Sequence, residues 1–279
     1  MDKADHDAHR EEIVVRVVTF LVVVPTIVVL AVHPALRTPF DVIVAAALVV
    51  GAIEYYRLVS VKSFSVRRWT LVVGVLIIAA AAHMGAASAG FALVVLALCL
   101  CHLYRRPPTI SGMAAETFGL LYVGLLGSHV IQLRALPDGS GHIILLFASV
   151  WLTDTGAYLV GSGFGRWKLS PRLSPRKTVE GAVAGLLFAA MGAALLKQMQ
   201  VAGKGPPMPP YTMCQYIVVA VLASVVGQAG DLVESALKRD ARIKDSGALF
   251  PGHGGLLDRC DSLLFAAPVV YYYAKLVLK

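Results

Sequence analysis

Residues 179–199 read VEGAVAGLLFAAMGAALLKQM, and no charged residue falls between Glu180 and Lys197. An α-helix needs about 20 predominantly apolar residues to cross the hydrocarbon core of a bilayer, so this segment predicts a membrane-spanning helix. The chain is therefore expected to be an all-α, polytopic integral membrane protein with about nine spanning helices. The eight other apolar runs are Ile13–Val32, Phe40–Ser60, Trp69–His83, Ala86–Tyr104, Met113–Leu136, His142–Gly161, Tyr211–Leu237 and Leu256–Leu278.

The composition agrees with this interpretation. Hydrophobic residues make up 57% of the 279 residues, charged residues make up 15%, and the mean hydropathy is +0.72. These values lie outside those of soluble globular domains and argue against a water-soluble fold. The cysteines fall within or beside apolar runs at a spacing unlike that of a zinc site, which predicts reduced packing residues. They are Cys99, Cys101, Cys214 and Cys260.

The basic residues predict the orientation of the chain. The net charge is +8, but Lys and Arg lie between apolar runs rather than along one polar face, which argues against a nucleic-acid partner. In membrane proteins the cytoplasmic loops carry an excess of Lys and Arg. If the N-terminus of this chain is cytoplasmic, most of its Lys and Arg residues fall on the cytoplasmic side. We therefore expect an N-in, C-out topology in a bacterial cytoplasmic (inner) membrane, with the active site on the cytoplasmic side.

The two parts of the chain differ in where their polar residues lie. Residues 1–110 are expected to form N-terminal membrane helices with ordinary basic flanks. Residues 111–279 are expected to form the catalytic membrane helices and their cytoplasmic loops, because acidic residues enter the apolar runs there. Glu54, Tyr55, Tyr56 and Arg57, at the end of the second run, are interpreted as an interfacial belt.

The most informative stretch begins with GDLVESALKR at residues 230–239 and ends with PGHGGLLDRCD at 251–261. Asp258 and Asp261 are spaced i, i+3, which places both carboxylates on one face of a helix, and Asp231 and Glu234 repeat that spacing. Two acidic helix faces across a short connection would suit Mg²⁺, which prefers carboxylates and substrate phosphates. The alternative is a set of salt bridges in which Lys238, Arg239 and Arg259 neutralise these acids.

The loop Pro251–Gly255 contains three glycines, Gly252, Gly254 and Gly255. Glycine permits positive φ and close backbone approach, so the loop N–H groups could cradle phosphate oxygens before a helix N-terminus. His253 would either hydrogen-bond a phosphate or cap the turn.

A second stretch runs from Asp154 through a basic segment, residues 166–178, to Gly181. Asp154 lies in or near the end of an apolar helix and needs a partner, which the basic segment could provide. Ser174, Arg176, Lys177 and Thr178 could hold nucleotide or lipid phosphate, with Thr178 near a helix start. The alternative is an ordinary positive-inside loop.

Together these stretches resemble the phosphatidate cytidylyltransferases, which convert CTP and phosphatidic acid into CDP-diacylglycerol and pyrophosphate. The resemblance covers residues 154–261, and Ser246 and Phe250 stand where the family has aromatic and aliphatic residues. It implies that Asp231, Asp258 and Asp261 bind the divalent cation that organises the CTP phosphates. It also implies a membrane lipid substrate and a homodimer. Completing the implied site are Lys238, Arg239, Lys244, Asp245 and Arg259, with substrate contacts at Asp154, Ser174, Arg176, Lys177, Thr178, Gly252, His253, Gly254 and Gly255.

The chemistry expected from these residues is attack of a phosphate oxygen on the α-phosphorus of a nucleoside triphosphate, with metal and basic side chains absorbing charge. A second divalent or a monovalent cation is left open. Two other enzymes fit similar residues, namely a CTP-dependent lipid (isoprenoid alcohol) kinase and a cytidylyltransferase acting on an isoprenoid phospholipid. A secondary transporter also places acids in broken helices, although near the midplane rather than at helix ends.

Overall fold

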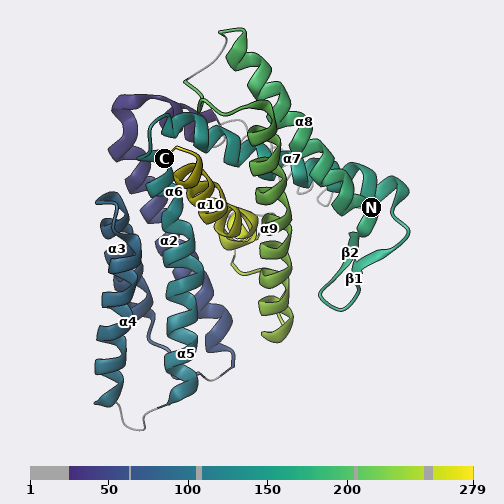
Figure 1. Cartoon of the computed structure of the whole chain (residues 1–279). Coiled ribbons are helices and arrows are strands. Elements are labelled where there is room, and N and C mark those ends of the chain that lie inside the picture. Colours follow the sequence, from purple (N-terminus) through teal and green to yellow (C-terminus); the bar gives the residue numbers. More distant parts are fainter. Residues whose placement is uncertain (1–24, 63, 105–108, 204–206, 248–253, 279) are drawn as a thin grey trace, which may run out of the picture.

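The computed structural model describes residues 25–62, 64–104, 109–203, 207–247 and 254–278. These residues form an almost wholly helical bundle (Figure 1). Residues 25–32 are helical and precede a short 3₁₀ turn, η1. The elements are η1 Pro34–Leu36, α2 Arg37–Ser60, α3 Arg68–His83, α4 Ala87–Leu103, α5 Ile110–Gly119, η2 Leu120–Leu125, α6 Leu126–Arg134, α7 Gly139–Phe164, β1 Lys168–Ser170, β2 Ser174–Thr178, α8 Val179–Val201, α9 Met213–Asp240 and α10 Leu257–Val277.

Eight of the nine apolar runs coincide with these helices, and the first run is described only from residue 25. Within the part of the chain that the structure describes, five helical stretches are long and apolar enough to cross a membrane: α2, the continuous α5–η2–α6 stretch, α7, α8 and α9. Helices α3 and α4 are apolar but shorter. The structure therefore supports an all-helical membrane protein, and the count of nine spans and the orientation remain predictions.

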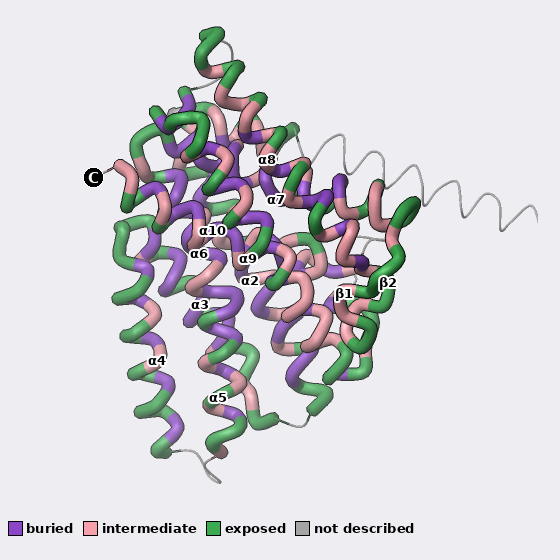
Figure 2. Tube along the Cα trace, turned by 45° about the vertical axis from the view of Figure 1, so that its right-hand side comes forward, coloured by how far each residue is buried: buried purple, intermediate pink, exposed green. Residues whose placement is uncertain are grey.

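The exposure pattern is that of a protein with an apolar exterior. Large apolar side chains are exposed along several helices, including Leu76 on α3, Leu96 on α4 and Leu187 on α8. Figure 2 shows exposed positions along the outer helices of the bundle, among them α3, α4 and α8. A soluble monomer rarely exposes contiguous apolar surface of this kind, whereas lipid would cover it. All four cysteines are free, as expected, but Cys99, Cys101 and Cys214 lie on this exposed surface rather than packing inside.

Helix α10 is central to the bundle. It packs against α9, α6, α7 and α2, and Figure 1 shows it between α6 and α9. Ala266, Ala267 and Val270 contribute to a core shared with α7, α8 and α9, whereas Leu257 and Leu264 contribute to a core shared with α2, α3 and η2. The start of α10 is therefore fixed by both halves of the chain.

The basic segment between α7 and α8 is an antiparallel β-hairpin, β1–β2, which the all-helical prediction did not include. Lys168 pairs with Thr178 and Ser170 with Ser174. Thr178 then caps α8, because its Oγ1 accepts the backbone N–H of Gly181 at 3.2 Å. The prediction of a helix start at Thr178 is confirmed.

Candidate active site

Helices α9 and α10 approach closely at Gly230. A Cβ atom there would lie 2.7 Å from the carbonyl oxygen of Asp261 and 2.9 Å from Cβ of Phe265, so only glycine permits this spacing. Because side chains three and four residues apart share a helix face, Asp231, Glu234 and Lys238 follow one another along α9 beside the start of α10. The close approach therefore brings together the acids that the sequence analysis singled out.

The first part of the site, here called the aspartate group, consists of Asp154, Asp231 and Asp261 around Lys177. Lys177 projects from β2 and forms an ion pair with Asp231, and both side chains are partly exposed. Asp154 on α7 and Asp261 on α10 are close enough to interact electrostatically with Asp231 and Lys177. The sequence analysis expected the basic segment to supply a partner for Asp154. In the structure Lys177 of that segment forms its ion pair with Asp231, and the partner role toward Asp154 stays a prediction.

Polar and small side chains pack beside Asp154. They include Thr153 of α7, Ser224 and Gln228 of α9 and Ser262 of α10. Thr153 donates to Ser224 at 2.6 Å, and the backbone N–H of Ser262 donates to Asp261 at 2.6 Å. The aspartate group is therefore backed by groups that can hydrogen-bond inside an apolar helix bundle.

The second part of the site is a buried ion-pair group in which one cation serves two carboxylates. Lys238 Nζ lies 2.5 Å from Glu234 Oε2 and 2.6 Å from Asp258 Oδ1. The Glu234 side chain is 1% exposed and the Asp258 side chain 9% exposed. Buried charges are tolerated only when they are paired and hydrogen-bonded, so Lys238 is the counter-charge on which both acids depend.

Asp258 is also held by the connection between α9 and α10. Its Oδ2 accepts the backbone N–H groups of Ser246 at 2.9 Å and Gly255 at 2.7 Å, and the hydroxyl of Ser246 at 2.9 Å. Gly254 has φ of +80°, which bears out the expectation that a glycine of this loop adopts a left-handed conformation. Both oxygens of Asp258 are therefore engaged within the protein.

The hairpin is tied to the end of α9. Arg239 Nε donates to the carbonyl oxygen of Leu173 at 3.3 Å, and Glu180 accepts the backbone N–H of Trp167 at 3.2 Å. The predicted contact residues Ser174, Arg176 and Lys177 all lie on β2. The structure thus joins the two stretches that the sequence analysis treated separately.

Other predicted site residues lie at the edge of this arrangement. Lys244, Asp245 and Arg259 are exposed, and Asp245 lies beside Gly254. Gly252 and His253 lie outside the described residues, so their predicted phosphate contacts stay predictions.

No group of three or more His, Cys, Asp or Glu side chains within residues 25–62, 64–104, 109–203, 207–247 and 254–278 is arranged to hold a metal ion by itself. Asp231 and Asp261 lie in the aspartate group, whereas Asp258 belongs to the ion-pair group with Lys238. The predicted metal role of all three aspartates stays a prediction.

Glu54 is the site residue that the sequence analysis missed. It was interpreted as part of an interfacial belt, but its side chain is 2% exposed and it accepts the backbone N–H groups of Leu256 at 3.0 Å and Leu257 at 2.7 Å. Tyr55 is buried as well and donates to the carbonyl oxygen of Ala115 at 2.8 Å. The belt interpretation is therefore wrong for both residues. The sequence signal that could have identified Glu54 as a site residue is an acidic residue inside an apolar run.

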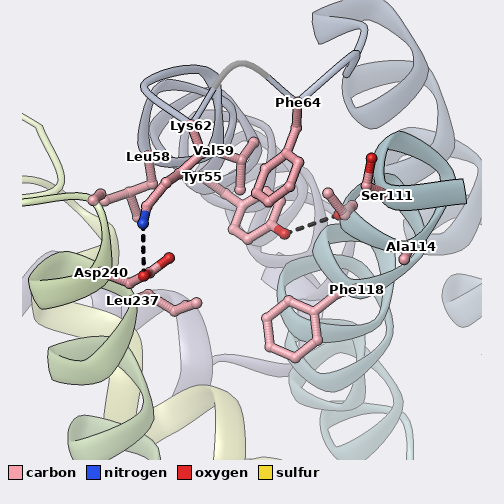
Figure 3. A pocket seen from close by; sticks show the side chains of 12 residues that line it. Tyr55, Leu58, Val59, Lys62, Phe64, Ser111, Ala114, Phe118, Leu237 and Asp240 are labelled. Carbon is pink, nitrogen blue, oxygen red and sulfur yellow. Dashed lines mark hydrogen bonds and ion pairs between the residues drawn. The ribbon is translucent and has the colours of Figure 1, made fainter. Parts of the chain in front are cut away.

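A separate apolar pocket of about 340 Å³ lies between the ends of α2 and α9 and the start of α5 (Figure 3). Tyr55, Phe64 and Phe118 form much of its wall, and an ion pair between Lys62 and Asp240 at 2.7 Å borders it. Its remaining lining residues are Leu58, Val59, Ser111, Ala114, Ala115, Leu237 and Ala241. The residues of α9 that line this pocket lie on a different helix face from Asp231 and Lys238.

Comparison with known proteins identifies the family. The model of the Cytidylyltransferase family matches residues 14–277, almost the whole chain. The chain belongs to this family. As a cytidylyltransferase-family protein it is a nucleotidyltransferase enzyme, and its family membership confirms the resemblance noted in the sequence.

Three relatives carry the name phosphatidate cytidylyltransferase. The protein from Synechocystis sp. is 34% identical over 275 residues, which cover 86% of this chain and 89% of the relative. The protein from Bacillus subtilis is 38% identical, with 64% of each chain covered. The protein from Brucella suis is 43% identical, with 58% of each chain covered. The aspartate and ion-pair groups lie within the part that matches the family model.

Proposed function

We propose that this chain is a phosphatidate cytidylyltransferase, which forms CDP-diacylglycerol and pyrophosphate from CTP and phosphatidic acid. Family membership and the names of the three relatives support this function. The structural observation that carries it is the pairing of Lys177 of the hairpin with Asp231 of α9 beside Asp261 of α10. This pairing places acidic and basic groups side by side, as recognition of a metal-bound polyphosphate requires.

The proposed reaction needs no protein nucleophile. A phosphate oxygen of phosphatidic acid attacks the α-phosphorus of CTP, one P–O bond forms, the bond to the β-phosphate oxygen breaks, and pyrophosphate leaves with the electron pair. The lipid phosphate is already anionic at neutral pH, so the protein mainly orients the reactants and stabilises developing negative charge. Lys177 and Lys238 are the cations closest to the acids, and we assign them to phosphate contacts together with Arg239, Lys244 and Arg259.

The donor chemistry fits Mg²⁺. This ion is usually held by one or two carboxylates together with substrate phosphates and water rather than by a complete protein cage. Asp231 and Asp261 would supply those carboxylates, and Asp258 would join them only after releasing Lys238. When bound, Mg²⁺ would neutralise charge on the CTP phosphates and polarise the reacting phosphorus.

We also propose nine spanning helices in an N-in, C-out arrangement, an active site at the cytoplasmic face of a bacterial inner membrane, and a homodimer. The coincidence of the helices with the apolar runs supports the span count. The basic hairpin and the basic end of α9 lie on the same side of the bundle as the aspartate group, which agrees with the positive-inside rule. The dimer rests on the family resemblance alone.

A label experiment tests the reaction. Purified protein in detergent is given phosphatidic acid and CTP labelled either at the α-phosphate or at the γ-phosphate. We expect the α-label, but not the γ-label, to enter the lipid. Parallel reactions contain an isoprenoid alcohol or an isoprenoid phosphate in place of phosphatidic acid. Transfer of the γ-label to the alcohol would instead identify a CTP-dependent lipid kinase, and entry of the α-label into the isoprenoid phosphate but not into phosphatidic acid would move the assignment to the isoprenoid substrate.

A further inference from the structure

Glu54 connects the N-terminal helices to the start of α10. Its Oε1 accepts the backbone N–H of Leu256 at 3.0 Å, and its Oε2 accepts that of Leu257 at 2.7 Å. The first N–H groups of an α-helix have no partner within the helix, and α10 has no side-chain cap from its own N-cap residue, Leu256. A carboxylate from α2 therefore performs the capping role for α10 and complements the positive end of its dipole.

Two glycines make room for this carboxylate. A Cβ atom at Gly247 would clash with the Glu54 carboxylate, lying 2.7 Å from its Cδ, and a Cβ atom at Gly255 would lie 2.6 Å from its Oε2. Neither glycine has a positive φ, so close packing rather than backbone conformation excludes a side chain there. The connection between α9 and α10 is thus shaped around Glu54.

The same connection holds Asp258. The Ser246 hydroxyl lies 2.9 Å from Asp258 Oδ2 and 3.3 Å from Glu54 Oε2, and Gly255 donates its N–H to Asp258. Glu54 and Asp258 therefore both hydrogen-bond within residues 255–257, and both lie within hydrogen-bond distance of the Ser246 hydroxyl. A displacement of residues 254–257 would move Asp258 relative to Lys238.

We propose that Glu54 is a positioning residue of the active site, which fixes residues 254–257 so that Asp258 meets Lys238. The inference rests on the proposed function. Glu54 itself contacts no reacting atom. It acts on the reaction by holding the backbone of residues 254–257, which in turn positions Asp258. Replacing a residue that orients a site residue typically changes activity by about 10–100-fold. The competing explanation is that Glu54 only stabilises the fold.

Glu116 provides a matched control. It too is a fully buried glutamate, and its Oε1 accepts a backbone N–H, from Arg67, at 2.6 Å. Its Oε2 lies 3.7 Å from Nε2 of His102 near the end of α4, and Arg67 immediately precedes α3. Both glutamates are replaced by glutamine, which keeps the size of the side chain. Both oxygens of Glu54 accept backbone N–H groups, so glutamine at this position must present its NH₂ group to one of these donors.

Two readouts are measured on purified full-length protein, namely amide hydrogen exchange and steady-state kinetics. For Glu54→Gln we expect faster exchange at residues 254–258, a fall in kcat of about tenfold or more, and an unchanged KM for phosphatidic acid. For Glu116→Gln we expect unchanged exchange at residues 254–258 and kcat close to that of the parent protein, because the amide oxygen can still accept the N–H of Arg67.

Equal losses of kcat in both variants, or unchanged exchange at residues 254–258 in Glu54→Gln, would overturn the proposal. If Glu54→Gln does not fold, Gly247→Ala displaces the carboxylate without changing its charge and must give the same two effects. A parent protein with no phosphatidate-dependent turnover would refute the proposed function instead, while the exchange data would still decide whether Glu54 holds the start of α10.

Discussion

Lys238 of α9 and Asp258 of α10 form a buried ion pair with an N–O distance of 2.6 Å, and the same lysine neutralises Glu234 one turn earlier. A second lysine, Lys62, pairs with Asp240 of α9 at 2.7 Å, but both side chains of this pair are exposed. The two pairs have nearly the same length and differ in burial. Their comparison separates the effect of burial from that of distance.

Lys238→Met is expected to abolish activity and to destabilise the protein strongly. Removing the cation leaves two buried carboxylates without a counter-charge, and breaking a buried pair costs about 3–5 kcal/mol. Lys62→Met is the matched control, because an exposed pair contributes only about 0–1 kcal/mol. Thermal unfolding in detergent measures both. A similar loss of stability in the two variants would contradict the burial argument.

Gly230→Ala is expected to reduce activity by driving α9 and α10 apart. The added Cβ would meet the Asp261 carbonyl oxygen at 2.7 Å, and backbone atoms cannot rotate away. Gly227→Ala is the control on the same interface, where the nearest atom would lie at 3.4 Å, an ordinary contact. Steady-state turnover distinguishes the two. If Gly227→Ala is as damaging as Gly230→Ala, the close approach at Gly230 does not set the site geometry.

Lys177→Met is expected to lower turnover at least tenfold, because Asp231 loses its partner and the hairpin loses its contact with the aspartate group. The pair is partly exposed, so the melting temperature should change little. Lys197→Met, at the other end of α8, removes the same charge away from the site. Equal activity of the two variants would remove the hairpin from the site.

Chelation of divalent cations is expected to stop the reaction, and added Mg²⁺ should restore it. Asp261→Asn should raise the Mg²⁺ concentration that gives half-maximal activity, since one proposed ligand is weakened. Asp240→Asn, on the far side of α9, should leave that concentration unchanged. Activity that persists in excess chelator, or an equal Mg²⁺ requirement in both variants, would rule out the proposed ligand.

Helix positions in this protein could be predicted well from the sequence, because each long apolar run can satisfy its backbone hydrogen bonds in a membrane only as a helix. The connections were harder. The basic segment 166–178 gave no period-two pattern of apolar residues, so the β1–β2 hairpin was not predicted. The expected helix start at Thr178 was correct because its cap is encoded locally.

The candidate site was predicted in part. The i, i+3 spacing of Asp258 and Asp261 indicated a shared helix face, but it could not show that Asp258 turns to Lys238 while Asp261 lies near Asp231. Glu54 was missed because its donors, Leu256 and Leu257, are backbone groups about 200 residues away, and backbone donors leave no pattern in the sequence. The role of Glu54 follows from its burial, which the sequence does not show. From the sequence alone, an acid near the end of an apolar run is equally compatible with an interfacial position.

The central claim is tested most directly by pyrophosphate release from CTP by purified protein, measured with and without phosphatidic acid in the presence of Mg²⁺. We predict release that requires phosphatidic acid and is lost in Asp258→Asn, whose amide no longer forms the ion pair with Lys238. Release that is absent, or that is indifferent to phosphatidic acid, would contradict the assignment and favour the lipid-kinase or transporter alternatives.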